Sequence, residues 1–164
     1  MSLDSQAHGS HAMTESALKQ QITEAMKDAM RAKDKVRLGT IRLALAEIKK
    51  IEVDERIDPD DTRVTGILDK MIKQRRESVR QYEAGARQDL ADIETAEIAV
   101  LQEFMPQALS ADDLSAIISK ALADTGAAGV QDMGKVMTAV RPAVIGRADM
   151  AAVSQMIKQK LTPG

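Results

Sequence analysis

The sequence predicts an all-α protein, with an N-terminal domain of long helical hairpins followed by a small C-terminal helical domain. Apolar residues recur at three- and four-residue spacing along most of the 164-residue chain, which is the period of one face of an α-helix. Aromatic residues make up only 1% of the chain, and the 10 methionines suit a core of packed helices better than a sheet. Strand-like alternation of apolar and polar residues is missing, which leaves helices as the simplest interpretation.

Four long helices are expected in the N-terminal domain, and each has a start or stop signal. The first follows Thr14 or Ser16, and Asp34 is placed to cap the second. Pro59 ends the second helix, because proline lacks the N–H that a helix interior requires. The third is expected over residues 62–84 and the fourth over 88–105, stopped by Gly85 and Pro106. Apolar positions expected to face the core include Leu38, Ile41, Leu45 and Ile48 in the second helix and Leu90, Ile93, Val100, Leu101 and Phe104 in the fourth.

Shorter elements are expected after Pro106. The Ser110-Ala-Asp-Asp113 sequence is a capping box that opens a helix closed by Gly126. Asp132 is placed to cap a short helix that Pro142 interrupts, and Asp149 to start the last helix. We therefore expect domains over residues 13–106 and 107–164. Residues 1–12 have no helical periodicity and are expected to be a disordered expression leader.

The amino-acid composition argues against several kinds of catalytic and metal-binding site. The chain has no cysteine, and both histidines, His8 and His11, lie in the expected leader. Thiol nucleophiles, disulfides and most zinc sites therefore lack their usual residues, and no metal or other cofactor is expected. The absence of cysteine fits a reducing compartment, so we expect a cytoplasmic protein. No apolar run approaches the roughly 20 residues that span a bilayer, so no membrane partner is expected.

Charge is distributed in blocks, although the net charge is only −2 and the isoelectric point is near 5.7. In the third helix Lys73, Arg76 and Arg80 follow one another at three- and four-residue spacing, with Arg75 and Arg87 nearby. Such a row of cations could bind successive phosphates of a nucleic-acid backbone. The alternative interpretation is a solvated helix face balanced by the acidic fourth helix.

A second basic block surrounds the starts of the two last helices. Lys135, Arg141 and Arg147 lie near these starts, and Lys158 and Lys160 lie on the final helix. Helix N-termini present N–H groups and the positive end of the helix dipole, so this block predicts a phosphate-binding cradle. A purely structural interpretation stays open, in which the aspartates are caps and the glycines allow turns and close packing.

The ordered motifs of the chain resemble the GatB/YqeY family over essentially everything after Met13. The motifs that carry the resemblance are Lys73-Gln-Arg-Arg-Glu-Ser78, Gln81-Tyr-Glu-Ala-Gly85, the acidic Glu97–Glu103 run into Met105-Pro-Gln-Ala-Leu-Ser110, Asp132-Met-Gly-Lys-Val-Met137 and Gly146-Arg-Ala-Asp149. This resemblance implies that the C-terminal domain is of the tail type found in the B subunit of glutamine-dependent Asp/Glu-tRNA amidotransferases. In those enzymes the tail recognises tRNA and the catalytic centres lie elsewhere.

The resemblance therefore implies a non-catalytic, tRNA-binding-like accessory protein whose partner is tRNA or a tRNA-handling protein. Its RNA-contact candidates are Lys135, Arg141 and Arg147, with Lys158 and Lys160, and the charge pattern adds Lys73, Arg76 and Arg80. The scarcity of aromatics argues against base stacking and favours recognition of folded RNA by its shape and backbone. No DNA partner is expected. The protein is expected to be a monomer.

Two other functions compete with RNA binding. The first is a helical adaptor that docks an amidotransferase or an aminoacyl-tRNA synthetase, since methionine-rich helices can present adaptable apolar surfaces. The second is autonomous carbon–nitrogen ligase activity with glutamine as the amido donor, an activity with which the family is labelled. The chain lacks a nucleophile elbow, a phosphate-binding Gly-Lys-Ser/Thr loop and a Cys/His pair, so no catalytic residue is predicted.

Overall fold

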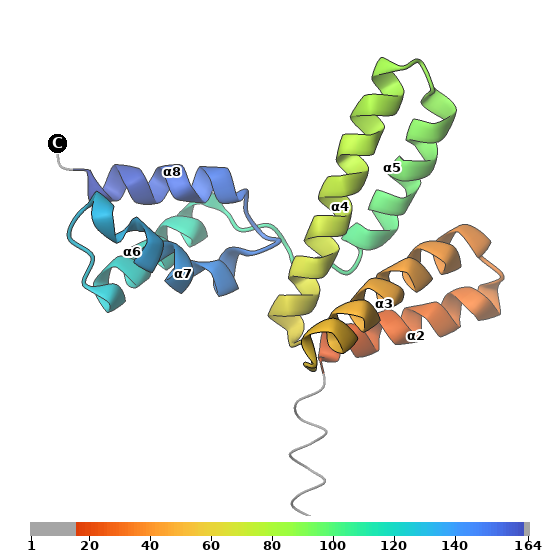
Figure 1. Ribbon diagram of the computed structural model, residues 1–164, viewed down its shortest axis with the longest axis horizontal. Helices are drawn as coiled ribbons and strands as arrows, with labels where there is room; N and C mark the ends of the chain where they lie inside the picture. Colours follow the sequence, from red (N-terminus) through yellow and green to blue (C-terminus); the bar gives the residue numbers. More distant parts are fainter. Residues whose placement is uncertain (1–15, 163–164) are drawn as a thin grey trace, which may run out of the picture. The chain divides into compact units, whose positions relative to one another are not determined.

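The computed structural model describes residues 16–162 and confirms the all-α prediction. Within this part of the chain there are seven α-helices, one short 3-10 helix and no strand (Figure 1). The chain divides between Met105 and Pro106 into two compact units. The expected leader, with His8 and His11, lies outside the described residues. None of the described helices combines the length and the apolar character needed to span a membrane.

The first helical hairpin of the N-terminal unit consists of α2 (Ala17–Ala32) and α3 (Lys35–Glu55). The Ser16 hydroxyl accepts a hydrogen bond from Lys19 N–H at 3.1 Å, so Ser16, one of the two predicted positions, caps α2. The turn is tight, because Lys33 adopts the left-handed conformation and Asp34 then caps α3 by accepting from Arg37 N–H at 3.1 Å. Local cap chemistry thus fixes where these two helices begin.

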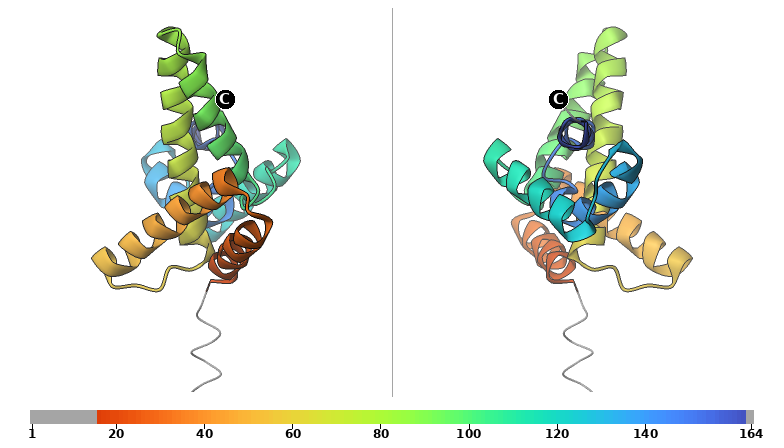
Figure 2. Two further views of the ribbon diagram at one scale, coloured as in Figure 1. Left: turned by 90° about the vertical axis from the view of Figure 1, so that its right-hand side faces the viewer. Right: turned by 90° about the vertical axis from the view of Figure 1, so that its left-hand side faces the viewer.

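The second hairpin consists of α4 (Asp61–Ala84) and α5 (Gln88–Gln102), which lie side by side in both views of Figure 2. Helix α5 ends three residues before the predicted Met105. The N–H groups of Phe104 and Met105 instead bond to carbonyls three residues back, because the residue before Pro106 is disfavoured in the helical conformation. Ile93 was expected to face the core but is 57% exposed.

The core of the N-terminal unit is built from all four helices. Its fully buried aliphatic side chains are Ile22, Ile41, Ile48, Val64, Leu68 and Leu101. Leu38 and Leu45, both expected inside, are only partly buried and pack at the edge of this core. Thr40 is 3% exposed and bonds to the Val36 carbonyl, so the α3 face that packs inward includes one polar residue.

The C-terminal unit contains α6 (Ala111–Thr125), a 3-10 helix η1 (Val130–Asp132), α7 (Met133–Val144) and α8 (Met150–Leu161). Ser110 caps α6 by accepting from Asp113 N–H at 3.1 Å, and Gly126 ends it in the left-handed conformation at φ 66°. Asp149 caps α8 by accepting from Ala151 N–H at 3.2 Å. Valines and isoleucines of α6, α7 and α8 form a second core, with Ile118, Val136, Val140, Val144, Val153 and Ile157 almost fully buried.

Two predictions about α7 are wrong. Asp132 does not cap α7, because its carboxylate accepts from Ala128 N–H at 2.9 Å and Gly129 N–H at 3.4 Å and so caps the 3-10 turn that precedes the helix. Pro142 does not interrupt α7, which continues to Val144. A proline this close to a helix end removes only one backbone hydrogen bond, and the buried Val144 keeps the last turn in place.

Candidate nucleic-acid interface

The predicted basic row of α4 is largely engaged with carboxylates of the same helix. Lys73 Nζ lies 2.9 Å from an Asp69 carboxylate oxygen, and Arg80 Nε donates to Glu77 at 3.0 Å. The hydrogen bond and charge of Arg80 hold the pKa of Glu77 below its usual range. Arg76 is exposed and has no carboxylate within 4.0 Å in residues 16–162. The structure therefore brings only Arg76 of this row to the surface without an ion-pair partner.

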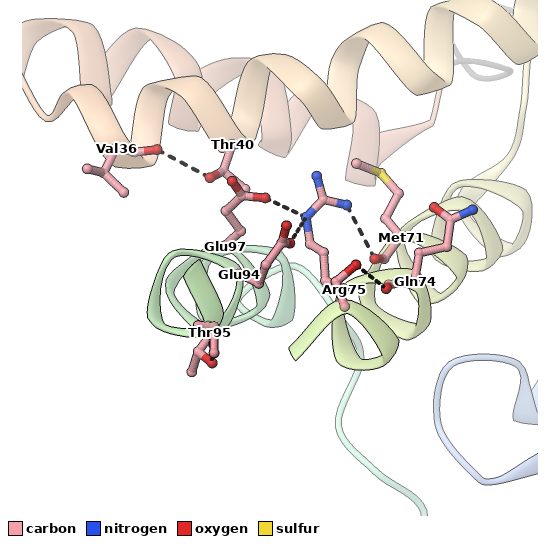
Figure 3. Close-up of polar contacts among 10 residues, drawn as sticks. Val36, Thr40, Met71, Gln74, Arg75, Glu94, Thr95 and Glu97 are labelled. Atoms are coloured by element: carbon pink, nitrogen blue, oxygen red, sulfur yellow. Dashed lines mark hydrogen bonds and ion pairs between the residues drawn. The ribbon is translucent and has the colours of Figure 1, made fainter. Parts of the chain in front are cut away.

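Arg75 lies between two helices and joins them. Its Nε is 2.7 Å from a Glu97 carboxylate oxygen and 4.0 Å from Glu94, both on α5, while its Nη1 donates to the Met71 carbonyl at 3.3 Å (Figure 3). The side chain of Arg75 is 15% exposed, and that of Glu97 is 21% exposed. Arg75 therefore serves the packing of α4 against α5.

Lys135 and Arg141 are both exposed on α7. They are six residues apart, so they point about 120° apart around the helix and lie about 9 Å apart along it. Val136, Val140 and Val144 occupy the buried side of the helix, and Lys135 and Arg141 lie at the two edges of the opposite, exposed side. Neither Lys135 nor Arg141 has a carboxylate within 4.0 Å in the part of the chain that the structure describes.

Arg147 makes hydrogen bonds with the backbone of the segment that precedes α6. Its Nε donates to the Gln107 carbonyl at 3.0 Å, and its own carbonyl accepts from Leu109 N–H at 2.9 Å. These two bonds attach the segment that leads into α6 to the connection between α7 and α8. Arg147 is partly buried, so the guanidinium has a structural use that is independent of any ligand.

The lysines of α8 differ from each other. Lys160 Nζ donates to the hydroxyls of Ser115 at 3.3 Å and Ser119 at 3.2 Å, and so links α8 to α6. Lys158 is exposed, and its backbone carbonyl accepts from the Thr162 hydroxyl at 2.7 Å. Both lysines lie in the last turn of α8, where a cation is favoured by the negative end of the helix dipole.

Helices α7 and α8 run in opposite directions and are joined by residues 145–149 (Figure 1). Lys135 and Lys158 are therefore at one end of this helix pair, and Arg141 and Arg147 are at the other. Each helix has 12 residues, so the two ends are about 18 Å apart. From the sequence, the starts of α7 and α8 were expected to form a single phosphate-binding cradle. In the structure these two starts lie at opposite ends of the helix pair, about 18 Å apart.

Charge pairing differs between the two units. In residues 16–105, ten of the 17 Lys and Arg side chains lie within 4.0 Å of a carboxylate. In residues 106–162 only Lys120 of six does, 2.5 Å from Asp124. The carboxylates of Asp132 and Asp149 are bonded to backbone N–H groups instead. The C-terminal unit consequently presents most of its cations without an ion-pair partner.

Asp132 is an acidic group whose charge is influenced by Lys135. The N–H groups of Ala128 and Gly129 hold the pKa of Asp132 below its usual range, and Lys135 adds a smaller effect in the same direction. Asp132 therefore stays ionised at neutral pH and lowers the local positive potential around Lys135. No group of three or more acidic or His/Cys side chains placed to hold a metal ion occurs in residues 16–162.

A family model described as Yqey-like protein matches residues 19–161, which includes every described helix except the first two residues of α2. The chain belongs to this family. The match spans both compact units, so the family resemblance seen in the sequence motifs is confirmed.

Relatives of this YqeY-family chain include fungal proteins named Altered inheritance of mitochondria protein 41, mitochondrial. The protein of Eremothecium gossypii is 37% identical over 98 residues, which is 58% of this chain and 54% of the relative. That of Vanderwaltozyma polyspora is 37% identical over 81 residues, covering 49% and 44%. That of Pyrenophora tritici-repentis is 29% identical over 137 residues, covering 82% and 75%. The chain thus spans about half the length of the first two relatives.

The names of these relatives contradict the prediction of a cytoplasmic protein, because they designate mitochondrial proteins. The prediction rested on the absence of cysteine. That absence fits reducing surroundings but does not distinguish one reducing compartment from another. The cytoplasmic prediction is therefore wrong.

Proposed function

We propose that this member of the YqeY-like family is a non-catalytic accessory protein that binds tRNA through the phosphate-facing cations of its C-terminal unit. The observation that supports the proposal is the charge pairing of that unit, where five of six Lys and Arg side chains have no carboxylate within 4.0 Å in the described residues. Cations without a carboxylate partner can release counterions from a phosphate backbone without first breaking an internal ion pair.

Lys135 and Lys158 are the primary contacts in this proposal, because they lie at the same end of the α7–α8 pair and their Nζ atoms have no hydrogen-bond partner within residues 16–162. Arg141 is a further contact at the opposite end. Lys160 contributes charge while it stays bonded to Ser115 and Ser119. The α4 residues Lys73, Arg76 and Arg80 are weaker candidates, since two of them would have to exchange a carboxylate for a phosphate.

The proposal is tested by titrating the intact chain into fluorescently labelled tRNA at about 50 and about 200 mM salt. We expect binding at low salt that weakens steeply as the salt concentration rises. The Lys135→Ala/Lys158→Ala variant should bind more weakly, and the slope of log K against log salt should fall by roughly 0.9 for each phosphate contact removed.

The matched control is Lys50→Ala/Lys70→Ala, which removes the same charge from two exposed positions of the N-terminal unit. We expect this variant to bind tRNA nearly as well as the unmodified chain. No binding at low salt would contradict the proposal. An equal loss of affinity in both double variants would also contradict it, because net charge rather than the C-terminal unit would then be responsible.

A further inference from the structure

Helix α3 carries apolar residues on two sides, and only one of them is packed. Ile41, Ala44 and Ile48 are 0% exposed and belong to the core. On the other side Val36 is 65% exposed, Leu43 49% and Val53 62%. A single exposed apolar residue is normal on a protein surface. Three exposed apolar residues on the same side of one long helix indicate a candidate contact surface.

The exposed residues follow a heptad spacing. Positions along this side of α3 alternate by three and four residues, which keeps them in one line along a helix that supercoils with another. We name this line the α3 row, and it consists of Val36, Gly39, Leu43, Ala46, Lys50 and Val53. Large and small residues alternate in the first four positions. A Cβ added at Gly39 would meet no atom within 4 Å, so the row has open space where a side chain of another helix can insert.

One flank of the α3 row is basic along its whole length. Lys35, Arg42 and Lys49 recur every seven residues and directly precede a residue of the row. Lys35 and Arg42 have no carboxylate within 4.0 Å in residues 16–162, and the carboxylate near Lys49 belongs to Glu52 at 3.9 Å. Lys49 is 74% exposed. This flank is therefore open to acidic side chains of a ligand.

The other flank consists of Thr40, Glu47 and Asp54. Thr40 is 3% exposed and Glu47 is half-buried, whereas Asp54, near the end of the helix, is exposed, so the accessible charge of this flank is acidic and lies at one end. A second copy of the chain is a poor occupant. In an antiparallel pair the basic flanks would face each other, and in a parallel pair Lys50 of one copy would face Lys50 of the other within the row.

We propose that the α3 row is the docking surface for an amphipathic helix of a partner protein, whose acidic residues face Lys35, Arg42 and Lys49. Lys50 lies within the row, so the partner is expected to place an acidic residue opposite it, which fixes the register. Gly39 and Ala46 fit the knobs of a facing helix but add little apolar area for insertion into a bilayer. This surface belongs to the N-terminal unit and is independent of the proposed RNA contacts.

Two synthetic three-heptad peptides test the proposal with the intact chain. Both have Leu and Ala in their apolar line. One has Glu at the flanks and opposite Lys50, and the other has Lys at the same positions. We expect the Glu peptide to bind, as measured by fluorescence anisotropy, and the Lys peptide to bind at least about tenfold more weakly.

Variants then locate the binding surface. Leu43→Gln/Val53→Gln should weaken binding of the Glu peptide about tenfold or more while leaving the helix intact, because glutamine is a good helix former. Ile93→Gln is the matched control, since Ile93 is an exposed apolar residue of α5 at 57%, and it should leave the affinity unchanged. Arg42→Glu/Lys49→Glu should reverse the preference between the two peptides.

Four results would overturn the proposal. The first is no binding of the Glu peptide, and the second is equal affinity for both peptides. The third is self-association of the chain in sedimentation equilibrium that Leu43→Gln/Val53→Gln abolishes, because a second copy would then be the occupant. The fourth is binding to anionic phospholipid vesicles that depends on the same two residues.

Discussion

Four aspartates bond to backbone N–H groups at helix starts or at the turn before one, and none of the four has a Lys or Arg side chain within 4.0 Å in residues 16–162. Asp34, Asp60 and Asp149 each accept from the N–H of a residue two or three positions later. Asp132 instead accepts from the N–H groups of Ala128 and Gly129, four and three positions earlier, and so caps the turn that precedes α7. Because an ionised carboxylate near a helix N-terminus satisfies backbone donors and the helix dipole together, it is less available to neighbouring lysines.

Asp61 is the carboxylate through which pH should affect stability. It accepts from the hydroxyl of Ser16, which is 5% exposed, and from Leu18 N–H at 3.1 Å. These bonds, the Ser16 bond above all, hold the pKa of Asp61 below its ordinary value of 3.8. A carboxylate with a lowered pKa in the folded state stabilises the protein above its unfolded pKa. That stabilisation is lost as the pH falls through the lower folded pKa.

We therefore expect Asp61→Ala to lower the free energy of unfolding by about 1 kcal/mol at neutral pH, because two hydrogen bonds to a charged acceptor at the start of α4 are lost. The difference from the unmodified chain should shrink as the pH falls below 3.8. Urea denaturation at several pH values measures both effects. Asp58→Ala, at an exposed position before α4, is the control and should have little effect. A difference that does not change with pH would contradict the assignment.

At the scale of the element, glycines occupy two contrasting environments. Gly39 is inside α3, where an added Cβ would meet nothing within 4 Å. Gly126 ends α6 at φ 66°, in the left-handed region that a residue with a Cβ enters at a cost. The same substitution should therefore have opposite effects at these positions.

Gly39→Ala should raise the free energy of unfolding by roughly 0.8–1 kcal/mol, since alanine loses less backbone entropy in a helix than glycine does. Gly126→Ala should lower it by about 1 kcal/mol, because alanine is strained in the left-handed conformation. Urea denaturation of the two variants and of the unmodified chain measures both values. Destabilisation by Gly39→Ala would show that the added methyl group disturbs α3.

At the scale of the whole molecule, each compact unit has its own buried core. Ile48 belongs to the core of the N-terminal unit and Ile157 to that of the C-terminal unit, and both are 0% exposed. The two sets of core residues have no member in common. Each core therefore supplies the apolar burial that stabilises its own unit.

Ile48→Ala and Ile157→Ala should each cost about 2–5 kcal/mol, through lost apolar burial and the cavity that remains. We expect hydrogen–deuterium exchange to accelerate in residues 16–105 for Ile48→Ala and in residues 106–162 for Ile157→Ala. Each variant serves as the control for the other. Equal acceleration throughout the chain in either variant would show that the units unfold together.

Much of the fold could be predicted because helix signals are local. The caps at Ser16, Asp34, Ser110 and Asp149 were predicted from the sequence, since a cap involves residues two or three positions apart. The prediction that Asp132 caps α7 is wrong because a 3-10 turn and a helix adjoin there, and the same carboxylate bonds to whichever N–H groups the turn exposes.

The candidate site was less predictable, because pairing joins residues that are far apart in the chain. The basic residues near α7 and α8 were identified from their spacing, but Arg147 proved to be bonded to the Gln107 carbonyl. Likewise the helical period of α4 places Arg75 near Lys73 without indicating that Arg75 pairs with Glu97 on another helix. Only Arg76 of the α4 row has no ion-pair partner within the described residues.

The sequence by itself determined the all-helical class and most helix limits, because periodicity and capping act within a few residues. Only the tertiary structure decided which apolar side of α3 is buried. Ile41 and Ile48 lie on one side, Val36 and Leu43 lie on the other, and both sets have a helical spacing. Burial depends on which helices lie alongside, and α2, α4 and α5 pack on the first side and leave the second exposed.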